Sequence, residues 1–250
     1  MIVDNKTIAG DYMRVSIWNE RPKAKGRRYR KGYSSEAQVR LNQKRAEQHL
    51  TDLIHTNFGQ HDYALRLDYK KLAAKLGRMP TEEEAGRHIY NFMRRLGRRY
   101  RRAGVEFRWL YVTEVGKNGN NVHHHVLLSG GISRDEIEKK WYAGYANSQR
   151  LQFCETGLRG LVHYIVKEPV TSKRWSSSHN LKKPIEDRGV GRIRVKDAKY
   201  INANKDDLTF VSTLFPGWTA TEIESTAWDA GAFGMFVTVQ LYRSDTKLFA

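Results

Sequence analysis

Three consecutive histidines, His123, His124 and His125, lie in the apolar run 121–128. Successive side chains of a β-strand point to opposite faces, so a strand here directs His123 and His125 to one face and His124 to the other. Imidazole is a common ligand of divalent metal ions. The spacing therefore predicts that His123 and His125 share a metal ion, although each histidine alone could be an ordinary half-buried strand residue.

A carboxylate that could join the two imidazoles lies in the preceding apolar segment. Residues 107–115 predict a second strand, and the Gly- and Asn-rich residues 115–121 predict the loop of a hairpin. A register that places Glu114 opposite His123 puts all three side chains on one face. Two nitrogens and one oxygen then bind a divalent cation and leave coordination positions open, as a catalytic site requires.

A candidate nucleophile follows in residues 156–169, which predict a helix ended by Pro169. One buried stripe has the spacing of a helix face: Leu158, Leu161, Val162 and Ile165. Tyr164 lies at the edge of this stripe, with Lys167 three residues on as its neighbour. A phenol has a reference pKa near 10, so a positive charge nearby is needed to favour the nucleophilic phenolate. The alternative is that Tyr164 packs in the core and Lys167 is solvated.

The order of these motifs resembles that of HUH endonucleases: a first strand at 62–69, the histidine strand, and a Tyr-x-x-Lys helix. Among these enzymes the chain is most similar to rolling-circle replication initiators of small bacterial plasmids and single-stranded DNA phages. Residues 173–184 also resemble the basic, serine-bearing segment that follows the tyrosine helix in phage-type initiators. The likeness covers about residues 33 to 184.

Two positions depart from the family pattern. The centre of the histidine motif is His124 rather than an aliphatic residue, which leaves the geometry intact because His124 faces the other way. Glu168 occupies the place where two-tyrosine relatives carry a second tyrosine. The chain therefore resembles the single-tyrosine type.

The resemblance implies a chemistry and a metal. A magnesium or manganese ion held by His123, His125 and Glu114 would polarise a scissile phosphate of single-stranded DNA. Tyr164 would attack it, leaving a 5′-phosphotyrosine and a free 3′-hydroxyl that primes replication, and a later hydroxyl could reverse the step. Lys167 would favour the phenolate or screen the phosphate. Imidazole ligands suit zinc as well, so the ligand types leave the ion open.

The resemblance also implies partners. They are single-stranded or hairpin origin DNA, a host helicase and polymerase, and a second copy of the chain for ending a round of replication. A single cysteine, Cys154, excludes an internal disulfide, and the sequence has no signal peptide and no apolar stretch of membrane-spanning length. We therefore expect no membrane partner and a location in the cytoplasm of a bacterial host cell.

The charge independently indicates a polyanionic partner. The 250 residues include 44 basic and 27 acidic residues, a net charge of +17. The excess belongs to residues 1–204, because residues 205–250 hold only three basic groups against six acids. In residues 21–31 seven cations follow without an acid, and Pro22 and Gly26 argue against regular structure, which predicts a flexible arm on the phosphate backbone.

A second basic cluster lies on a predicted helix at 81–103. A capping box of Thr81 and Glu84 opens this helix, and its apolar stripe is Ile89, Phe92, Met93, Leu96 and Tyr100. The other face carries Arg94, Arg95, Arg98, Arg99, Arg101 and Arg102, with no acids among them to form ion pairs. A solvated charged face is the alternative. The residues that we predict to contact DNA are Arg27, Arg28, Arg30, Arg94, Arg98, Arg102 and Arg174.

The remaining patterns predict an α+β fold. Residues 1–32 predict an arm or weak early strand, a helix runs from Ser34 or Ser35 to about His55, and Ser133 with Glu136 opens a further helix. Further predictions are short strands at 150–154 and 234–243, extended chain at 192–201 and a turn at 215–218. The β-α-β-β-α-β order favours an antiparallel sheet with helices packed on one side, the ferredoxin-like or RRM-like arrangement of an HUH core.

The expected organisation has three parts. They are a basic arm with the N-terminal helix (1–57), the HUH endonuclease core (58–184), and a C-terminal extension of the same domain or a small accessory layer (185–250). Three classes of function stay open. They are a single-tyrosine nicking and joining enzyme, with relaxases and single-stranded transposases as near neighbours; a zinc hydrolase that activates water; and a non-enzymatic nucleic-acid binder with a structural histidine cluster.

Overall fold

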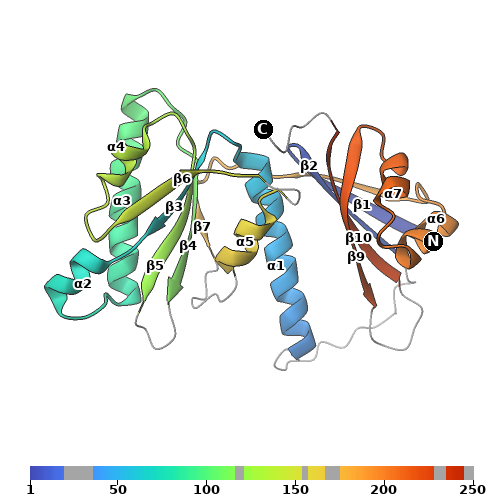
Figure 1. Cartoon of the computed structure of the whole chain (residues 1–250), viewed down its shortest axis with the longest axis horizontal. Helices are drawn as coiled ribbons and strands as arrows, with labels where there is room; N and C mark the ends of the chain where they lie inside the picture. The colour runs from blue at the N-terminus through green and yellow to red at the C-terminus, as the bar shows by residue number, and fades with distance from the viewer. Residues whose placement is uncertain (20–35, 116–120, 154–156, 167–174, 228–234, 245–250) are drawn as a thin grey trace. The chain divides into compact units, whose positions relative to one another are not determined.

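The computed structural model describes residues 1–19, 36–115, 121–153, 157–166, 175–227 and 235–244. The chain divides into two compact units (Figure 1). The first unit combines Met1–Thr56, Phe153–Gly157 and Lys183–Ala250, and the second unit combines Asn57–Gln152 and Leu158–Lys182. Each has its own five-stranded antiparallel sheet among the described residues, which confirms the predicted α+β class.

The second unit contains the histidine strand. Its elements are β3 (Tyr63–Leu67), α2 (Lys70–Leu76), α3 (Glu82–Arg102), β4 (Trp109–Val115), β5 (Val122–Leu128), α4 (Arg134–Glu138), β6 (Ala146–Arg150), α5 (Arg159–Val166) and β7 (Ser176–Ser177). The sheet has the order β6-β3-β5-β4-β7. The histidine strand β5 is therefore central, between β3 and β4, and both of its edges are hydrogen-bonded.

Helix α3 packs against one face of this sheet. Its capping box forms as predicted, because Thr81 accepts from the Glu84 backbone N–H and the Glu84 carboxylate accepts from the Thr81 N–H. The predicted apolar stripe is buried and joins one core with side chains of β3 and β5, namely Ile89, Phe92, Met93, Leu96, Tyr100, Tyr63, Leu65, Leu67, Val122, Val126 and Leu128. We call this side of the sheet the α3 face.

The opposite side of the same sheet is the histidine face. Alternation along the strands places Arg66 of β3, Glu114 of β4, and His123 and His125 of β5 on it. Leu110, Val112 and Leu127 share this face, and all three are buried although they do not belong to the core under α3. Helix α5 contacts β4 and lies on the other side of the sheet from α3 (Figure 1). Its Leu158 and Val162 are buried.

The first unit is built from both ends of the chain. Its elements are β1 (Ile2–Ala9), β2 (Tyr12–Asn19), α1 (Glu36–Asn57), β8 (Ile185–Val190), α6 (Val195–Ala203), α7 (Leu208–Leu214), β9 (Trp218–Ala227) and β10 (Met235–Arg243). The sheet has the order β8-β1-β2-β10-β9. Strand β2, near the N-terminus, therefore pairs with β10, near the C-terminus.

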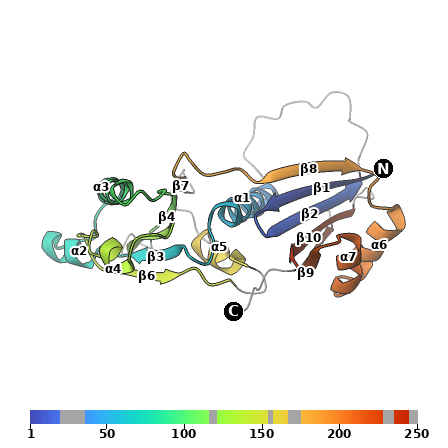
Figure 2. The ribbon, with the colours of Figure 1, turned by 90° about the horizontal axis from the view of Figure 1, so that it is seen from above.

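The two faces of the first sheet differ in polarity. Helices α6 and α7 cover an apolar face, whose core includes Val15, Ile17, Val237 and Val239 (Figure 2). Helix α1 lies on the other face through polar contacts. Arg14 pairs with Asp52 at 2.6 Å, Lys44 with Glu224 at 2.6 Å, and the Tyr242 hydroxyl lies 3.0 Å from His55 Nε2.

Several predicted elements differ from the observed ones. The strand at 234–243 and the turn at 215–218 are confirmed, the latter by a bond from Trp218 N–H to the Phe215 carbonyl. Residues 192–201 were expected to be extended, which is wrong, since α6 is a helix whose Ala198 and Ile201 face the core. The short strand predicted at 150–154 lies earlier, as β6, because its partner is β3. Residues 2–19 form a full hairpin rather than an arm or weak strand.

Candidate metal centre

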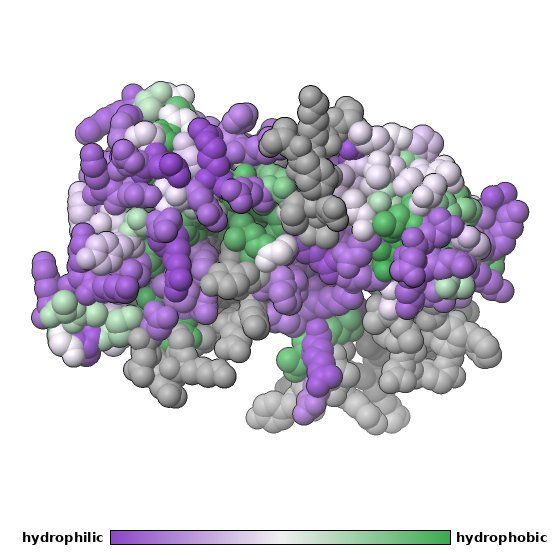
Figure 3. Space-filling model, viewed as in Figure 1, coloured by the Kyte–Doolittle hydropathy of each residue, from purple (hydrophilic) through white to green (hydrophobic). Residues whose placement is uncertain are grey.

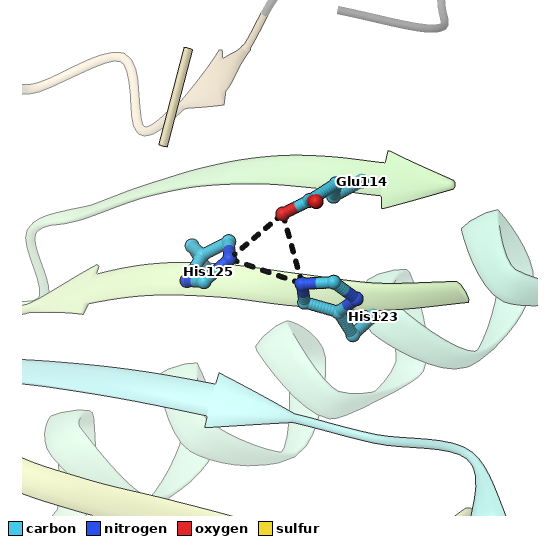
Figure 4. A group of neighbouring side chains, drawn as sticks. All are labelled: Glu114, His123 and His125. Atoms are coloured by element: carbon cyan, nitrogen blue, oxygen red, sulfur yellow. Dashed lines mark hydrogen bonds and ion pairs between the residues drawn. The ribbon is translucent and has the colours of Figure 1, made fainter. Parts of the chain in front are cut away.

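The hairpin of β4 and β5 brings the three predicted ligands together. Its register places Glu114 opposite His123 and Val112 opposite His125, as the sequence predicted. All three ligand side chains consequently extend from the histidine face, with α3 behind the strands (Figure 4). Among the described residues they are the group of histidine, cysteine or acidic side chains whose ligand atoms lie close enough to hold a metal ion.

The three donor atoms form a nearly equilateral triangle. Glu114 Oε2 lies 2.9 Å from His123 Nε2 and 3.2 Å from His125 Nε2, and the two nitrogens are 3.1 Å apart. Ligands about 2.1 Å from an octahedral ion are about 3.0 Å apart, and those about 2.0 Å from a tetrahedral ion are about 3.3 Å apart. The triangle lies between these values, so the group could bind a divalent cation of either geometry.

Burial and charge favour the ligand forms of these side chains. His123 and His125 are buried, whereas the Glu114 side chain is 36 % exposed, which leaves the centre open on one side. Burial lowers the pKa of His125, the charges of His123 and Arg66 lower it further, and Glu114 partly opposes them. A neutral imidazole at neutral pH is the form that binds a metal ion. In the described part of the chain, the buried His123 Nδ1 has no hydrogen-bond partner.

The central histidine, His124, points to the α3 face, as expected. Its Nε2 lies 2.7 Å from the Tyr69 hydroxyl and its Nδ1 lies 3.0 Å from Thr113 Oγ1. Because the phenol proton of Tyr69 goes to the Ala85 carbonyl, the Nε2–H of His124 donates to Tyr69 and Nδ1 accepts from Thr113. Burial lowers the pKa of His124 to about 3, so the ring is neutral and structural.

The proposed nucleophile, Tyr164, lies on α5, the helix that contacts β4. Strand β4 also carries Glu114, so the tyrosine helix and one metal ligand belong to neighbouring elements of one unit. Lys167 lies outside the described residues. The role of both side chains stays a prediction.

The predicted DNA-binding arginines are separated by the structure. Arg94, Arg98 and Arg102 are exposed on α3, which packs against the face opposite the metal centre. Hydrophilic residues cover much of the surface around α3 in Figure 3. Arg27, Arg28, Arg30 and Arg174 lie outside the described residues.

The arginine row of α3 is not wholly free of ion pairs, contrary to the sequence-based expectation. Arg99 pairs with Glu136 at 2.6 Å, and Arg95 donates to the Lys140 carbonyl. The acid and the carbonyl come from α4 and the residues after it, which sequence spacing along α3 does not reveal. Glu136 is thus engaged by Arg99, although Ser133 still caps α4 by accepting from the Glu136 N–H.

Sequence reasoning missed one basic side chain close to the metal centre. Arg66 lies opposite His125 on the histidine face and is exposed. The available signal was the alternation of strand 62–69, in which Tyr63, Leu65 and Leu67 are apolar and Arg66 lies between them. Once that strand pairs with the histidine strand, Arg66 must share a face with His123 and His125.

Comparison with known proteins gives one match. A family model of replication-associated proteins, described as the ORF2 type, matches residues 63–173, a range that includes β3, the three ligand residues and α5. No curated protein and no solved structure matches the chain. The family match supports a Rep-type replication initiator and, with it, DNA binding. No helix in the described parts of the chain has the length and apolarity needed to cross a membrane.

Proposed function

We propose that the chain is an HUH-type endonuclease that nicks single-stranded origin DNA and rejoins strands during rolling-circle replication. The observation that carries this proposal is the triangle of Glu114, His123 and His125 on adjacent strands, inside the range that matches a replication-associated family. A magnesium or manganese ion bound there would polarise the scissile phosphate and offset its charge. The open, solvent-facing side of the centre is the route by which a phosphate reaches it.

In this proposal Tyr164 is the nucleophile. Its phenol oxygen forms a bond to phosphorus as the bond from phosphorus to the 3′-oxygen breaks. The phenol loses its proton, and the leaving 3′-oxygen ends as a hydroxyl. Lys167, one helical turn on, favours the phenolate or screens the phosphate. The contact of α5 with β4 supports this assignment, because it places the tyrosine helix beside the strand of Glu114.

The products explain why such a reaction suits replication. The free 3′-hydroxyl primes synthesis, and the phosphotyrosine keeps the energy of the broken bond, so that a later hydroxyl can displace Tyr164 and close a circle. With one tyrosine per chain, a second copy would supply the second nucleophile. The partners in this proposal are single-stranded or hairpin origin DNA and a host helicase and polymerase, in the cytoplasm of a bacterial host. Relaxases and single-stranded transposases share the same chemistry.

A zinc hydrolase is the second candidate, because the donor triangle also suits a tetrahedral ion. In that case water rather than Tyr164 would attack, and no covalent product would accumulate. A non-catalytic nucleic-acid binder would give neither product. The three candidates therefore differ in one measurable species, the protein–DNA adduct.

The test uses the full chain with manganese and a single-stranded oligonucleotide that carries the cognate origin, labelled on the 3′ side of the nick. We expect a labelled covalent adduct that survives a denaturing gel. Tyr164→Phe should abolish the adduct and retain DNA binding, whereas Tyr90→Phe, at a tyrosine 62 % exposed on α3, should leave it unchanged. Full nicking by Tyr164→Phe would remove the proposed nucleophile, and turnover without adduct would favour the hydrolase.

A further inference from the structure

A polar cavity of about 460 Å³ lies in the second unit, close to the candidate metal centre. Its lining residues are Arg66, Asp68, Lys70, Asn121, Tyr145 and Asn147. The volume lies within the range of sites that hold small ligands, about 300–1,000 Å³. All six side chains can donate or accept hydrogen bonds, so the cavity suits a polar occupant.

Strand pairing connects this cavity to the metal centre. Arg66 lies opposite His125 on one side and opposite Asn147 on the other, so all three share the histidine face. Adjacent strands are about 5 Å apart, which makes Arg66 a direct neighbour of a metal ligand. The influence of its charge on the pKa of His125, which burial chiefly lowers, agrees with this position. A guanidinium here can bind a phosphate next to one held at the metal centre.

Tyr145, at the cavity wall, is held in place by its backbone. Its N–H donates to Asp68 Oδ1 at 2.7 Å, and its carbonyl accepts from the Asp68 N–H at 2.9 Å. Trp141 Nε1 donates to the Asp68 carbonyl, and a Cβ at Gly144 would overlap that same oxygen. Only a glycine lets the loop approach so closely. The residue is therefore fixed before any ligand binds.

The ring of Tyr145 is nonetheless 60 % exposed, and Lys71 Nζ lies 5.0 Å from its centroid. A fixed, exposed aromatic ring among cations is the arrangement on which bases of single-stranded nucleic acid stack. Asp68, whose carboxylate is oriented by the N–H groups of Lys70 and Tyr145, and the amides of Asn121 and Asn147 can hydrogen-bond to the edge of a base.

We propose that this cavity binds a nucleotide adjacent to the scissile phosphate. Tyr145 stacks on the base, Arg66 binds the phosphate between that nucleotide and the metal centre, and Asp68 with the two asparagines contacts the base edge. The proposal rests on the proposed function, since it assumes that single-stranded DNA crosses the histidine face. It assigns the contacts that hold the strand, which the nicking chemistry alone does not require.

The test measures binding without cleavage. The full chain, in chelator and without metal, is titrated into a fluorescent single-stranded DNA of random sequence, and into the corresponding duplex. Tyr145→Ala should weaken single-strand binding by about 5- to 150-fold, because stacking of one base contributes about 1–3 kcal/mol. Duplex binding should change little, since paired bases cannot stack on the ring. Tyr145→Phe should restore binding.

Tyr142→Ala is the matched control, because Tyr142 is 66 % exposed, lies beneath Arg95 and does not line the cavity next to the metal centre. Equal losses for Tyr145→Ala and Tyr142→Ala, or equal losses for duplex and single strand, would overturn the proposal. Arg66→Gln should also weaken single-strand binding, and an unchanged affinity would remove the phosphate contact.

The result is separable from the fate of the proposed function. A Tyr145-dependent affinity in a protein that never forms a Tyr164 adduct would support the cavity and contradict the nickase. Adduct formation by wild-type protein, together with an unchanged single-strand affinity of Tyr145→Ala, would support the nickase and overturn the cavity. Placing 2-aminopurine at successive positions of a cleaved strand then tests the register. We expect Tyr145-dependent quenching at the position next to the nick, and quenching several nucleotides away would contradict adjacency.

Discussion

The Tyr69 hydroxyl lies 2.7 Å from Nε2 of His124, beneath the strand that carries the candidate metal ligands on its other face. Tyr69 also bonds to the Ala85 carbonyl in the first turn of α3, and His124 bonds to Thr113 on β4. The chain of bonds therefore ties α3, β5 and β4 together. Since a slip of one residue in β5 would exchange the faces of all three histidines, this network specifies the register that the metal centre needs.

We expect Tyr69→Phe to destabilise the second unit by about 1–3 kcal/mol, because it leaves buried polar groups of His124 and Ala85 without their partner. Urea unfolding should report the loss. Tyr63→Phe is the control, as Tyr63 belongs to the same core without a part in this network. Equal stability of the wild type and Tyr69→Phe would show that the network does not hold the strand.

Metal binding should depend on all three ligands. Calorimetry with Mn²⁺ should show at least a tenfold loss of affinity, about 1.4 kcal/mol, for His123→Ala, for His125→Ala and for Glu114→Gln. His61→Ala, at an exposed histidine of the same unit, should bind as the wild type does. Unchanged affinity in the three ligand variants would contradict the assignment of the centre.

Acid should weaken the first unit through His55. Burial lowers the pKa of His55 to about 4, below the value near 6.5 of the unfolded chain. The unfolded state therefore takes up a proton first as the pH falls, and stability decreases between about pH 6.5 and about pH 4, by up to about 3 kcal/mol.

Urea unfolding at about pH 7.5 and about pH 4.5 measures this dependence. His55→Gln should lose part of the difference between the two conditions, because it removes the titrating group, while His61→Ala keeps the full difference. Carboxylates titrate equally in the wild type and both variants, so the comparison isolates the imidazole. An identical pH dependence in His55→Gln would show that His55 carries none of it.

The exposed arginines of α3 should act on DNA away from the cleavage point. Because α3 packs on the face opposite the metal centre, the combined change of Arg94, Arg98 and Arg102 to Gln should weaken duplex binding and reduce its salt dependence by about one unit of slope per lost phosphate contact. Nicking of a saturating short single strand should be unaffected. Anisotropy titrations at several salt concentrations give the slope.

The control for this prediction removes the same charge elsewhere. Lys196, Lys199 and Lys205 are exposed in and after α6 of the first unit, and their combined change to Gln should leave the slope nearer to that of the wild type. An equal effect of both triple variants would mean that total charge, rather than the α3 surface, determines binding. Slower nicking of the short strand by the α3 variant would contradict the separation of the two surfaces.

The local patterns of the second unit were strong enough to predict its elements and the ligand triangle. The apolar alternation of β5, the loop before it and the capping box at Thr81 each depend on residues close in sequence, and the strand pairing and the capping box are observed. The arginine contacts of α3 were missed because Glu136 and Lys140 approach from a different element. Arg66 was missed because its importance arises only from pairing β3 with β5.

In the first unit, local patterns were weaker than tertiary contacts. Residues 2–9 contain Asp4, Asn5 and Lys6, which are unusual in strands, yet pairing with β2 and β8 makes them one. Residues 195–203 carry isolated apolar side chains that suited either an extended chain or a helix. Burial of Ala198 and Ile201 in the core decides for the helix.

The pairing of β2 with β10 has a consequence for synthesis of the chain. Ile17 meets Val237 across this ladder, so the hairpin of β1 and β2 leaves the ribosome long before its neighbour exists. The second unit, nearly continuous in sequence, can fold in the meantime, whereas the early hairpin waits with an unpaired edge. Chains stopped before residue 235 would therefore expose that edge to other chains, and aggregation of such truncated products is the expected result.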